Sequence, residues 1–220
     1  MRAQLSILIA LALAGGCQPV PTELTTAGGQ TAAVPGTPHL FEFDDAAGGL
    51  PTTMTNVLGQ WSREADASSP SGPNVLYQRG EYGAADFPRA MVNELTFTDA
   101  TVSVRCRPEA GHIDQACGLM FRAHDSDNYY LTRANAIEGN VRLYRVVDGS
   151  RMQLASANRE VARNAWQALQ ANTAGDEIIV SWNGEEVIRV HDASYAKGKI
   201  GVWTKADSVT AFDDLLAIEQ

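Results

Sequence analysis

The chain has 220 residues and 45% of them are apolar, so it can bury a full hydrophobic core in one sizeable domain with accessory segments. Lysine and arginine total 17 against 26 aspartate and glutamate residues, which gives a net charge of −9. Nucleic-acid binding needs basic patches that displace counterions, so this charge argues against a nucleic-acid partner.

Residues 1–16 predict a signal peptide. Arg2 precedes a short apolar run, LSILIALAL, which is too short to span a bilayer as a helix of about 20 residues. The stretch LALAGGC resembles the lipobox of bacterial lipoproteins, in which the cysteine is acylated, although its leucine lies four places before Cys17 instead of three. We therefore expect a lipid at Cys17 that anchors the protein to a membrane of the bacterial cell envelope. An ordinary secretory signal cleaved after Ala14, which would give a secreted protein, is the alternative.

Residues 17–38 predict a flexible tether. The segment is rich in Pro, Thr, Ala and Gly and shows no apolar periodicity. The folded domain is expected to cover residues 39–220.

Short strands follow one another through that domain. Segments such as ATVSVRCR, NVRLYRVV and EIIVSWNG are five to nine residues long, rich in β-branched and aromatic residues, and bounded by Gly, Asn, Asp or Pro. Turns are indicated at residues 138–140, at residues 148–150 and at Asn183-Gly184, and residues 192–198 predict one helical turn. More than a dozen strands favour an all-β fold, a two-sheet jelly-roll sandwich.

Two cysteines lie near the facing ends of consecutive strands. Cys106 and Cys117 enclose a loop of ten residues. If Cys17 carries lipid, these two form an even pair in an oxidising compartment, and we expect a disulfide. Two reduced buried thiols are the alternative, whereas two ligands do not make a zinc site.

The stretch FRAHDSDNYYLTR, residues 121–133, concentrates polar residues. Asp125, Ser126 and Asp127 bond readily to nearby backbone amides, so a polar hairpin loop is expected. Acid–base catalysis would instead require these carboxylates to meet in a desolvated cleft.

The last third of the chain resembles concanavalin A-like lectin/glucanase domains, in the bacterial group described as 3-keto-disaccharide hydrolase-like or laminin-G-like. The shared features are Trp166, the Asn183-Gly184 hairpin, the segment DASYAKGKIGVW, and FDD at residues 212–214. Upstream, GLMFRAHDSDNYYLTRAN and FEFDDAAGGLP also match. The resemblance covers residues 39–220 and implies the sandwich fold, which hosts lectins, glycosidases and inert modules alike.

The catalytic motif of family 16 glycosidases on this fold, E-x-D-x-x-E, is incomplete. It starts at Glu42 and at Glu64, but Ala47 and Ser69 stand where the last glutamate is needed. The resemblance also implies a structural calcium ion between the first and last strands. Its ligands would be Asp44 and Asp213, with their neighbours Asp45 and Asp214. Exposed aspartates at strand ends that bind no metal are the alternative. No other cofactor is expected.

Polar and aromatic residues on the central strands are candidates for ligand binding. They are Arg122, Tyr130, Arg133, Asn135, Arg142 and Tyr144. They offer bidentate donors and flat stacking faces, although simple alternation does not put all of them on one face. We expect an envelope-tethered, non-catalytic module that binds a glycan. A hydrolase of glycosides or keto-sugars, or a structural or protein-interaction module, are the alternatives.

Overall fold

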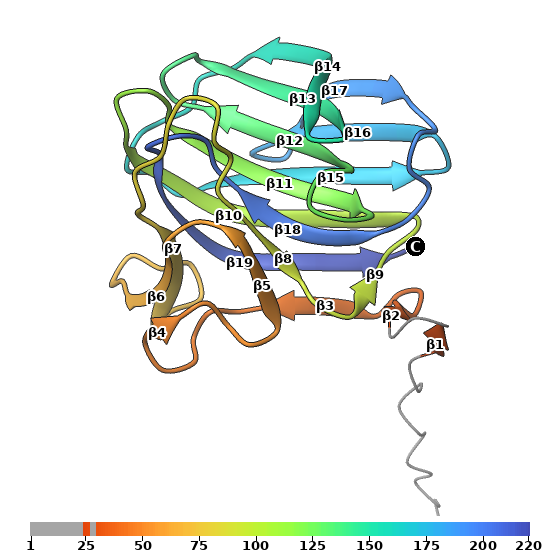
Figure 1. Cartoon of the computed structure of the whole chain (residues 1–220), viewed down its shortest axis with the longest axis horizontal. Helices are drawn as coiled ribbons and strands as arrows, with labels where there is room; N and C mark the ends of the chain where they lie inside the picture. Colours follow the sequence, from red (N-terminus) through yellow and green to blue (C-terminus); the bar gives the residue numbers. More distant parts are fainter. Residues whose placement is uncertain (1–23, 27–29) are drawn as a thin grey trace, which may run out of the picture.

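The computed structural model of the chain describes residues 24–26 and 30–220. Its strands form two large antiparallel sheets stacked face to face, as the sequence predicted (Figure 1). Within the described residues there is no helix that is long and apolar enough to cross a membrane. The predicted signal peptide and the predicted lipidation site at Cys17 lie outside the described residues.

Strands that are far apart in sequence lie side by side in each sheet. The nine-stranded sheet has the order β17 (Glu185–His191), β16 (Glu177–Trp182), β15 (Gln167–Ala174), β10 (Ala100–Ala110), β19 (Val209–Glu219), β7 (Asn74–Gln78), β6 (Trp61–Ala65) and β4 (Gly48–Gly49), with β3 (Pro38–Phe41) also paired to β19. The seven-stranded sheet has the order β14 (Ser150–Asn158), β13 (Asn140–Val147), β12 (Tyr129–Asn135), β11 (Ala116–Ala123), β18 (Lys199–Trp203), β8 (Arg89–Val92) and β5 (Met54–Leu58).

A third, small sheet lies at the start of the described chain. It consists of β1 (Leu24–Thr26), β2 (Gln30–Ala32) and β9 (Leu95–Thr96). The backbone N–H of Ala33 donates to the carbonyl of Thr96 at 3.0 Å. Residues 31–33 of the predicted tether are thus hydrogen-bonded to the domain, and the flexibility of the remainder stays a prediction.

Most of the expected strands are present, and the differences have local causes. RAMVNELTF forms two strands, β8 and β9, because Glu94 adopts a left-handed conformation with φ of 63°. Strand β5 was not expected from the sequence, and its burial pattern does not alternate. Residues 192–198 form bends instead of the expected helical turn. The Tyr130 hydroxyl accepts the backbone N–H groups of Ser194 and Tyr195 at 3.0 and 3.3 Å and docks this segment on β12.

The inner faces of the two sheets meet in one apolar core. Alternate residues point inward, as on β10, where Val102 and Val104 are buried. Leu119 and Phe121 of β11 face them from the other sheet and belong to the same cluster. Each fully buried side chain of this size contributes about 1.5–3 kcal/mol.

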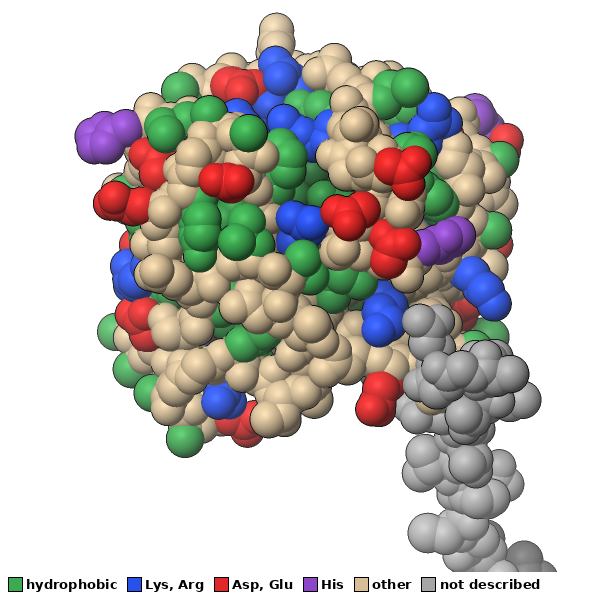
Figure 2. Space-filling model, in the orientation of Figure 1, with side chains coloured by type: hydrophobic (Ala, Val, Ile, Leu, Met, Phe, Trp, Pro, Cys, Tyr) green, Lys and Arg blue, Asp and Glu red, His purple; other side chains and the backbone are tan. Residues whose placement is uncertain are grey.

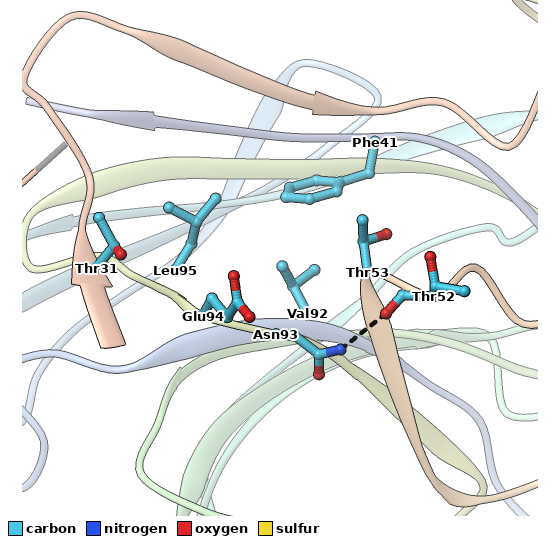
Figure 3. A pocket seen from close by; sticks show the side chains of 8 residues that line it. All are labelled: Thr31, Phe41, Thr52, Thr53, Val92, Asn93, Glu94 and Leu95. Carbon is cyan, nitrogen blue, oxygen red and sulfur yellow. Dashed lines mark hydrogen bonds between the residues drawn. The ribbon is translucent and has the colours of Figure 1, made fainter. Parts of the chain in front are cut away.

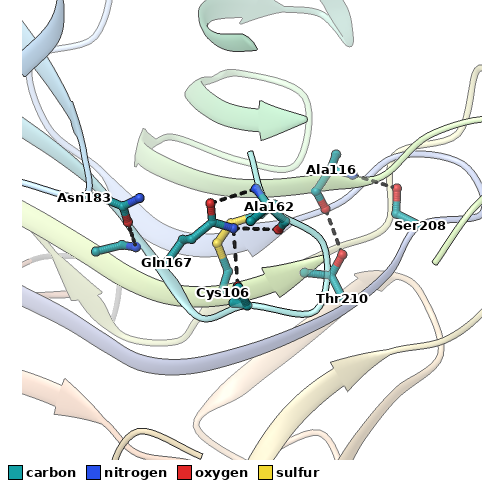
Figure 4. The surroundings of a disulfide bond; sticks show 10 residues. Cys106, Ala116, Ala162, Gln167, Asn183, Ser208 and Thr210 are labelled. Atoms are coloured by element: carbon teal, nitrogen blue, oxygen red, sulfur yellow. Dashed lines mark hydrogen bonds between the residues drawn. A yellow bond between two sulfur atoms is a disulfide. The ribbon is translucent and has the colours of Figure 1, made fainter. Parts of the chain in front are cut away.

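A disulfide joins Cys106 to Cys117 with 6.1 Å between their Cα atoms, which confirms the predicted pair (Figure 4). Cys106 lies on β10 of the nine-stranded sheet and Cys117 on β11 of the seven-stranded sheet, and both are fully buried. The bridge therefore crosses the core and ties the two sheets together covalently.

Replacing both cysteines, Cys106→Ala with Cys117→Ala, is expected to lower the free energy of unfolding by about 3 kcal/mol, because the unfolded chain regains the entropy of an open loop. Denaturant unfolding followed by circular dichroism measures this loss. The variant Cys17→Ala serves as the control and should unfold like the wild type. A double variant of unchanged stability would contradict the structural role of the bridge.

Candidate functional site

The two faces of the seven-stranded sheet have different surroundings. The inner face packs on the nine-stranded sheet, and the outer face points away from it. The outer face nevertheless carries its own cluster of buried apolar residues, which includes Met120, Tyr129, Leu131, Tyr144 and Trp203. Apolar residues on a face without a partner sheet need another cover. Figure 2 shows basic, acidic and hydrophobic side chains intermingled on the face of the molecule in view.

Arg151 covers the aromatic part of this cluster. Its guanidinium carbon lies 4.3 Å from the ring centroid of Phe87, 5.0 Å from that of Tyr144 and 5.5 Å from that of Trp203. These distances fall inside the range of about 6 Å for cation–π contacts. The indole of Trp203 can lie against β11 because residue 118 is glycine. A Cβ at Gly118 would come within 2.8 Å of the Trp203 carbonyl oxygen and 2.9 Å of its ring.

Two arginines beside this aromatic floor share one carboxylate. Arg133 on β12 and Arg142 on β13 are paired across the two strands. Their guanidinium groups lie 2.8 and 3.1 Å from the same oxygen of Glu138. Burial of Glu138 acts to raise its pKa, but the charge and hydrogen bond of Arg133, helped by Asn140, leave that pKa below its ordinary value. Glu138 is thus an anion that orients both arginines.

A second ion pair lies at the same end of the sheet. The buried carboxylate of Asp114 accepts hydrogen bonds from Lys205 at 2.8 Å and from Asn135 at 2.5 Å. The loop that carries Asp114 is held by Asp207, whose carboxylate accepts the backbone N–H groups of residues 112–114 at 2.6–3.0 Å. We call six charged residues of this face the outer-face cluster: Asp114, Arg133, Glu138, Arg142, Arg151 and Lys205.

Four of the six residues predicted to bind a ligand lie together on the outer face. Arg133 and Asn135 are alternate residues of β12, and Arg142 and Tyr144 are alternate residues of β13. The strand register pairs Arg133 with Arg142, so the four side chains are contiguous. Arg133, Asn135 and Tyr144 are buried, and Arg142 is partly exposed. The Tyr144 hydroxyl accepts from Arg133 at 3.3 Å.

Tyr130 and Arg122 lie away from those four residues. Tyr130 points to the inner face, where its ring stacks on Phe121 and its hydroxyl donates to Asp192. Alternation predicted that Arg122 shares the face of Met120, and this is wrong. Arg122 lies within a register irregularity of β11 and has φ of 45°, which turns its side chain away from that face. Its buried guanidinium donates to Asp99 and to three backbone carbonyls, which occupies almost all its donors.

Sequence reasoning did not single out Asp114, Glu138, Arg151 or Lys205 as site residues. A usable signal existed for Arg151, because the predicted turn at residues 148–150 makes a hairpin that pairs Arg151 with Val146. Asp114 and Lys205 come from loops 91 positions apart, and no local pattern connects them.

The residues expected to bind calcium accept hydrogen bonds from protein groups. Asp44 accepts the backbone N–H of Asn74 at 3.1 Å. Asp213 is fully buried and accepts from the hydroxyls of Ser69 at 2.5 Å and Ser71 at 3.3 Å. Burial raises the pKa of the Asp213 carboxyl. Within the described part of the chain, no three His, Cys, Asp or Glu side chains lie together as a metal site would need.

The polar stretch at residues 124–128 is a hairpin loop, as predicted. The backbone N–H of His124 donates to the carbonyl of Asn128 at 2.9 Å. The Asp125 carboxylate accepts the backbone N–H of Asp127 at 2.7 Å and the side-chain amide of Asn128 at 3.0 Å. His124, Asp125 and Asp127 are exposed and do not converge in a cavity.

One pair of carboxylates lies close together on the nine-stranded sheet. The Tyr77 hydroxyl lies 2.9 Å from an oxygen of Asp66 and 2.9 Å from an oxygen of Glu109. Burial acts to raise the pKa of Asp66, but hydrogen bonds from Arg107 and Ser68 hold it well below its usual range. Arg107 also pairs with Glu109 at 2.7 Å. Asp66 therefore carries no proton to donate at neutral pH. These side chains form a structural ion-pair network and not an acid–base pair.

Two hollows of the described surface contain no carboxylate pair, whereas a third of about 260 Å³ is lined by Glu42, Asp44 and Asp45. One of about 300 Å³ lies where Asn93 donates to the Thr52 carbonyl, and Glu94 supplies its one carboxylate (Figure 3). Another of about 460 Å³ lies on the nine-stranded sheet and contains Arg105 and Asp214. Neither includes a residue of the outer-face cluster.

Solved structures share this fold at low sequence identity. The carbohydrate-binding module CBM66 from Bacillus subtilis is 21% identical, with a TM-score of 0.64 over 76% of this chain and 96% of that chain. A protein of unknown function with a galectin-like fold, also from Bacillus subtilis, is 15% identical, with a TM-score of 0.55 over 76% and 90%. The Crh5 transglycosylase is 10% identical, with a TM-score of 0.57 over 86% and 88%.

No protein family and no curated protein matches the sequence. At these identities the structural likeness establishes the fold alone. The predicted jelly-roll sandwich of the concanavalin A-like type is confirmed, and the narrower hydrolase-like or laminin-G-like grouping stays a prediction.

Glu138→Gln is expected to be less stable than the wild type at pH 7. The folded state lowers the Glu138 pKa, so its stabilisation is present above the unfolded value of 4.5. It is lost as the pH falls through the folded pKa, and the two proteins should then converge. Urea unfolding at a series of pH values measures the difference. Glu81→Gln, at an exposed position, is the control, and a difference that does not shrink in acid would contradict the ionic role of Glu138.

Proposed function

We propose that this protein is a β-sandwich module that binds carbohydrate, without catalysis, through the outer face of its seven-stranded sheet. The observation that carries the proposal is the group of Arg133, Asn135, Arg142 and Tyr144, in which Arg142 is partly exposed, beside buried aromatic residues of the same face. Oriented polar groups next to apolar and aromatic surface are the usual makeup of small-ligand sites, and planar guanidinium groups give directional hydrogen bonds. The likeness in fold to a carbohydrate-binding module supports the same use of this sandwich.

The charges of the outer face favour binding over hydrolysis. Both of its carboxylates are ion-paired, Asp114 with Lys205 and Glu138 with the two arginines. Glycoside hydrolysis needs a carboxylic acid whose pKa is raised, so that it can protonate the leaving group. Burial raises the pKa of Asp213 and of Glu219, but both lie on β19 in the other sheet. A hydrolase acting on glycosides or keto-sugars is therefore the less supported alternative.

The proposed location is the bacterial cell envelope. It rests on the N-terminal sequence, in which a short apolar run leads into LALAGGC. A lipid on Cys17 would hold the domain near a membrane surface, whereas cleavage after Ala14 would release it. The buried Cys106–Cys117 bridge supports an oxidising compartment, because disulfides persist mainly outside the cytosol.

On an array of neutral and acidic glycans, the full-length protein is expected to bind at least one carbohydrate. Arg142→Gln is expected to weaken that binding about tenfold or more, because it removes charge-assisted hydrogen bonds at a partly exposed position. Arg189→Gln, on β17 of the other sheet, should bind like the wild type. An array without any bound glycan, or equal binding by Arg142→Gln, would count against this face as the site.

Cys17→Ala is expected to abolish incorporation of radiolabelled palmitate and to move the protein from the membrane fraction to the soluble fraction. Cells that express the wild type, Cys17→Ala or the control Ser6→Ala, which leaves the cysteine intact, are labelled and fractionated. A Cys17→Ala protein that stays in the membrane fraction and keeps the label would contradict acylation at this residue.

A further inference from the structure

Arg151 is a partly buried arginine of the described chain that has no acidic partner. Among residues 31–220, the arginines that make no ion pair with a described residue are Arg105, Arg151 and Arg163. Arg105 and Arg163 are exposed, so water solvates their charges. Arg151 is half-buried over three aromatic rings, where water can solvate its charge only in part.

The charge of Arg151 is offset only in part, by Asp114, which does not form an ion pair with it. Burial lowers the pKa of Arg151, and the positive charge of Arg133 acts in the same direction. Within the described chain no carboxylate lies within ion-pair distance of it. Its nitrogen atoms are not sealed from solvent, since none of them is among the buried polar atoms that lack a partner. A ligand could therefore reach donors that the protein itself does not use.

The outer-face cluster as a whole carries excess positive charge. It contains four cationic side chains and two carboxylates, and the adjacent Asp207 carboxylate brings the sum to +1 on a chain whose net charge is −9. Arg133 and Arg151 both lie within 6 Å of the Tyr144 ring centroid. A local excess of this sign, in a protein of the opposite net charge, attracts anions to one place on the surface.

We propose that the carbohydrate bound by this face carries an anionic group, a carboxylate or a sulfate, and that Arg151 holds that group. This inference rests on the proposed function. A guanidinium presents parallel N–H donors that match the two oxygens of such an anion. The aromatic rings beneath Arg151 hold it in place, so little side-chain freedom is lost on binding.

The experiment compares matched anionic and neutral carbohydrates on the full-length protein. Oligogalacturonate is titrated beside its methyl ester, and dextran sulfate beside dextran, by isothermal calorimetry. At least one anionic member is expected to bind about tenfold or more tightly than its neutral counterpart. The uronate arm and the sulfate arm distinguish the two sources of the charge. Raising NaCl from about 0.05 to 0.5 M should weaken the affinity for the anionic carbohydrate, because salt screens the attraction between its charge and the Arg151 guanidinium.

Arg151→Gln should abolish the preference for the anionic member, whereas Arg163→Gln should retain it. Arg151→Lys keeps a positive charge but not the planar fork, and it should retain part of the preference if Arg151→Gln fails to fold. Equal binding of charged and neutral members, or a preference unchanged in Arg151→Gln, overturns this inference and leaves carbohydrate binding intact. No binding in either arm and none on the glycan array overturns both.

Discussion

The packing of the two sheets through their apolar inner faces, fixed by the Cys106–Cys117 bridge, determines which way the side chains of the regular strands point. Side chains alternate along a strand, so once one set is buried the set between them must face outward. Leu143 of β13 is buried in the shared core, and its neighbours Arg142 and Tyr144 therefore lie on the outer face. A register slip of one residue would bury the arginines and expose the core. The stability of the sandwich and the composition of its outer face are thus set by the same register.

The outer face is prepared before any ligand arrives. Glu138 holds Arg133 and Arg142 in one arrangement, and Asp207 holds the loop that carries Asp114. Arg133, Arg142 and Arg151 stand on strands, so their positions are fixed by the sheet. Asp114, Glu138 and Lys205 lie in turns or loops and are held by their ion pairs. Pre-positioned donors lose little freedom on binding, which favours selective recognition of one ligand geometry. The same interactions lower the pKa of Glu138 and keep it ionised, which suits a binding surface better than a proton donor.

Much of the fold could be predicted from local sequence patterns, because alternation, turn residues and cysteine spacing act over a few residues. The β16–β17 turn at Asn183 and the disulfide are examples. Part of the site could not be predicted, because it depends on contacts between residues far apart in sequence and on irregular backbone. The Asp114–Lys205 pair depends on how distant loops meet, and the turning of Arg122 away from Met120 depends on a strand irregularity that alternation does not encode. Four of the six ligand-binding candidates share one face because they lie on two neighbouring strands with regular register.

The absence of a side chain at Gly118 has a consequence for how recognition could diverge in this sandwich. The Trp203 backbone and ring already lie within contact distance of the position where a Cβ would stand. Any larger residue would displace the indole, and the guanidinium resting on it would move as well. A substitution at Gly118 could therefore change selectivity without contacting the bound molecule, because it would shift the Trp203 indole on which Arg151 lies.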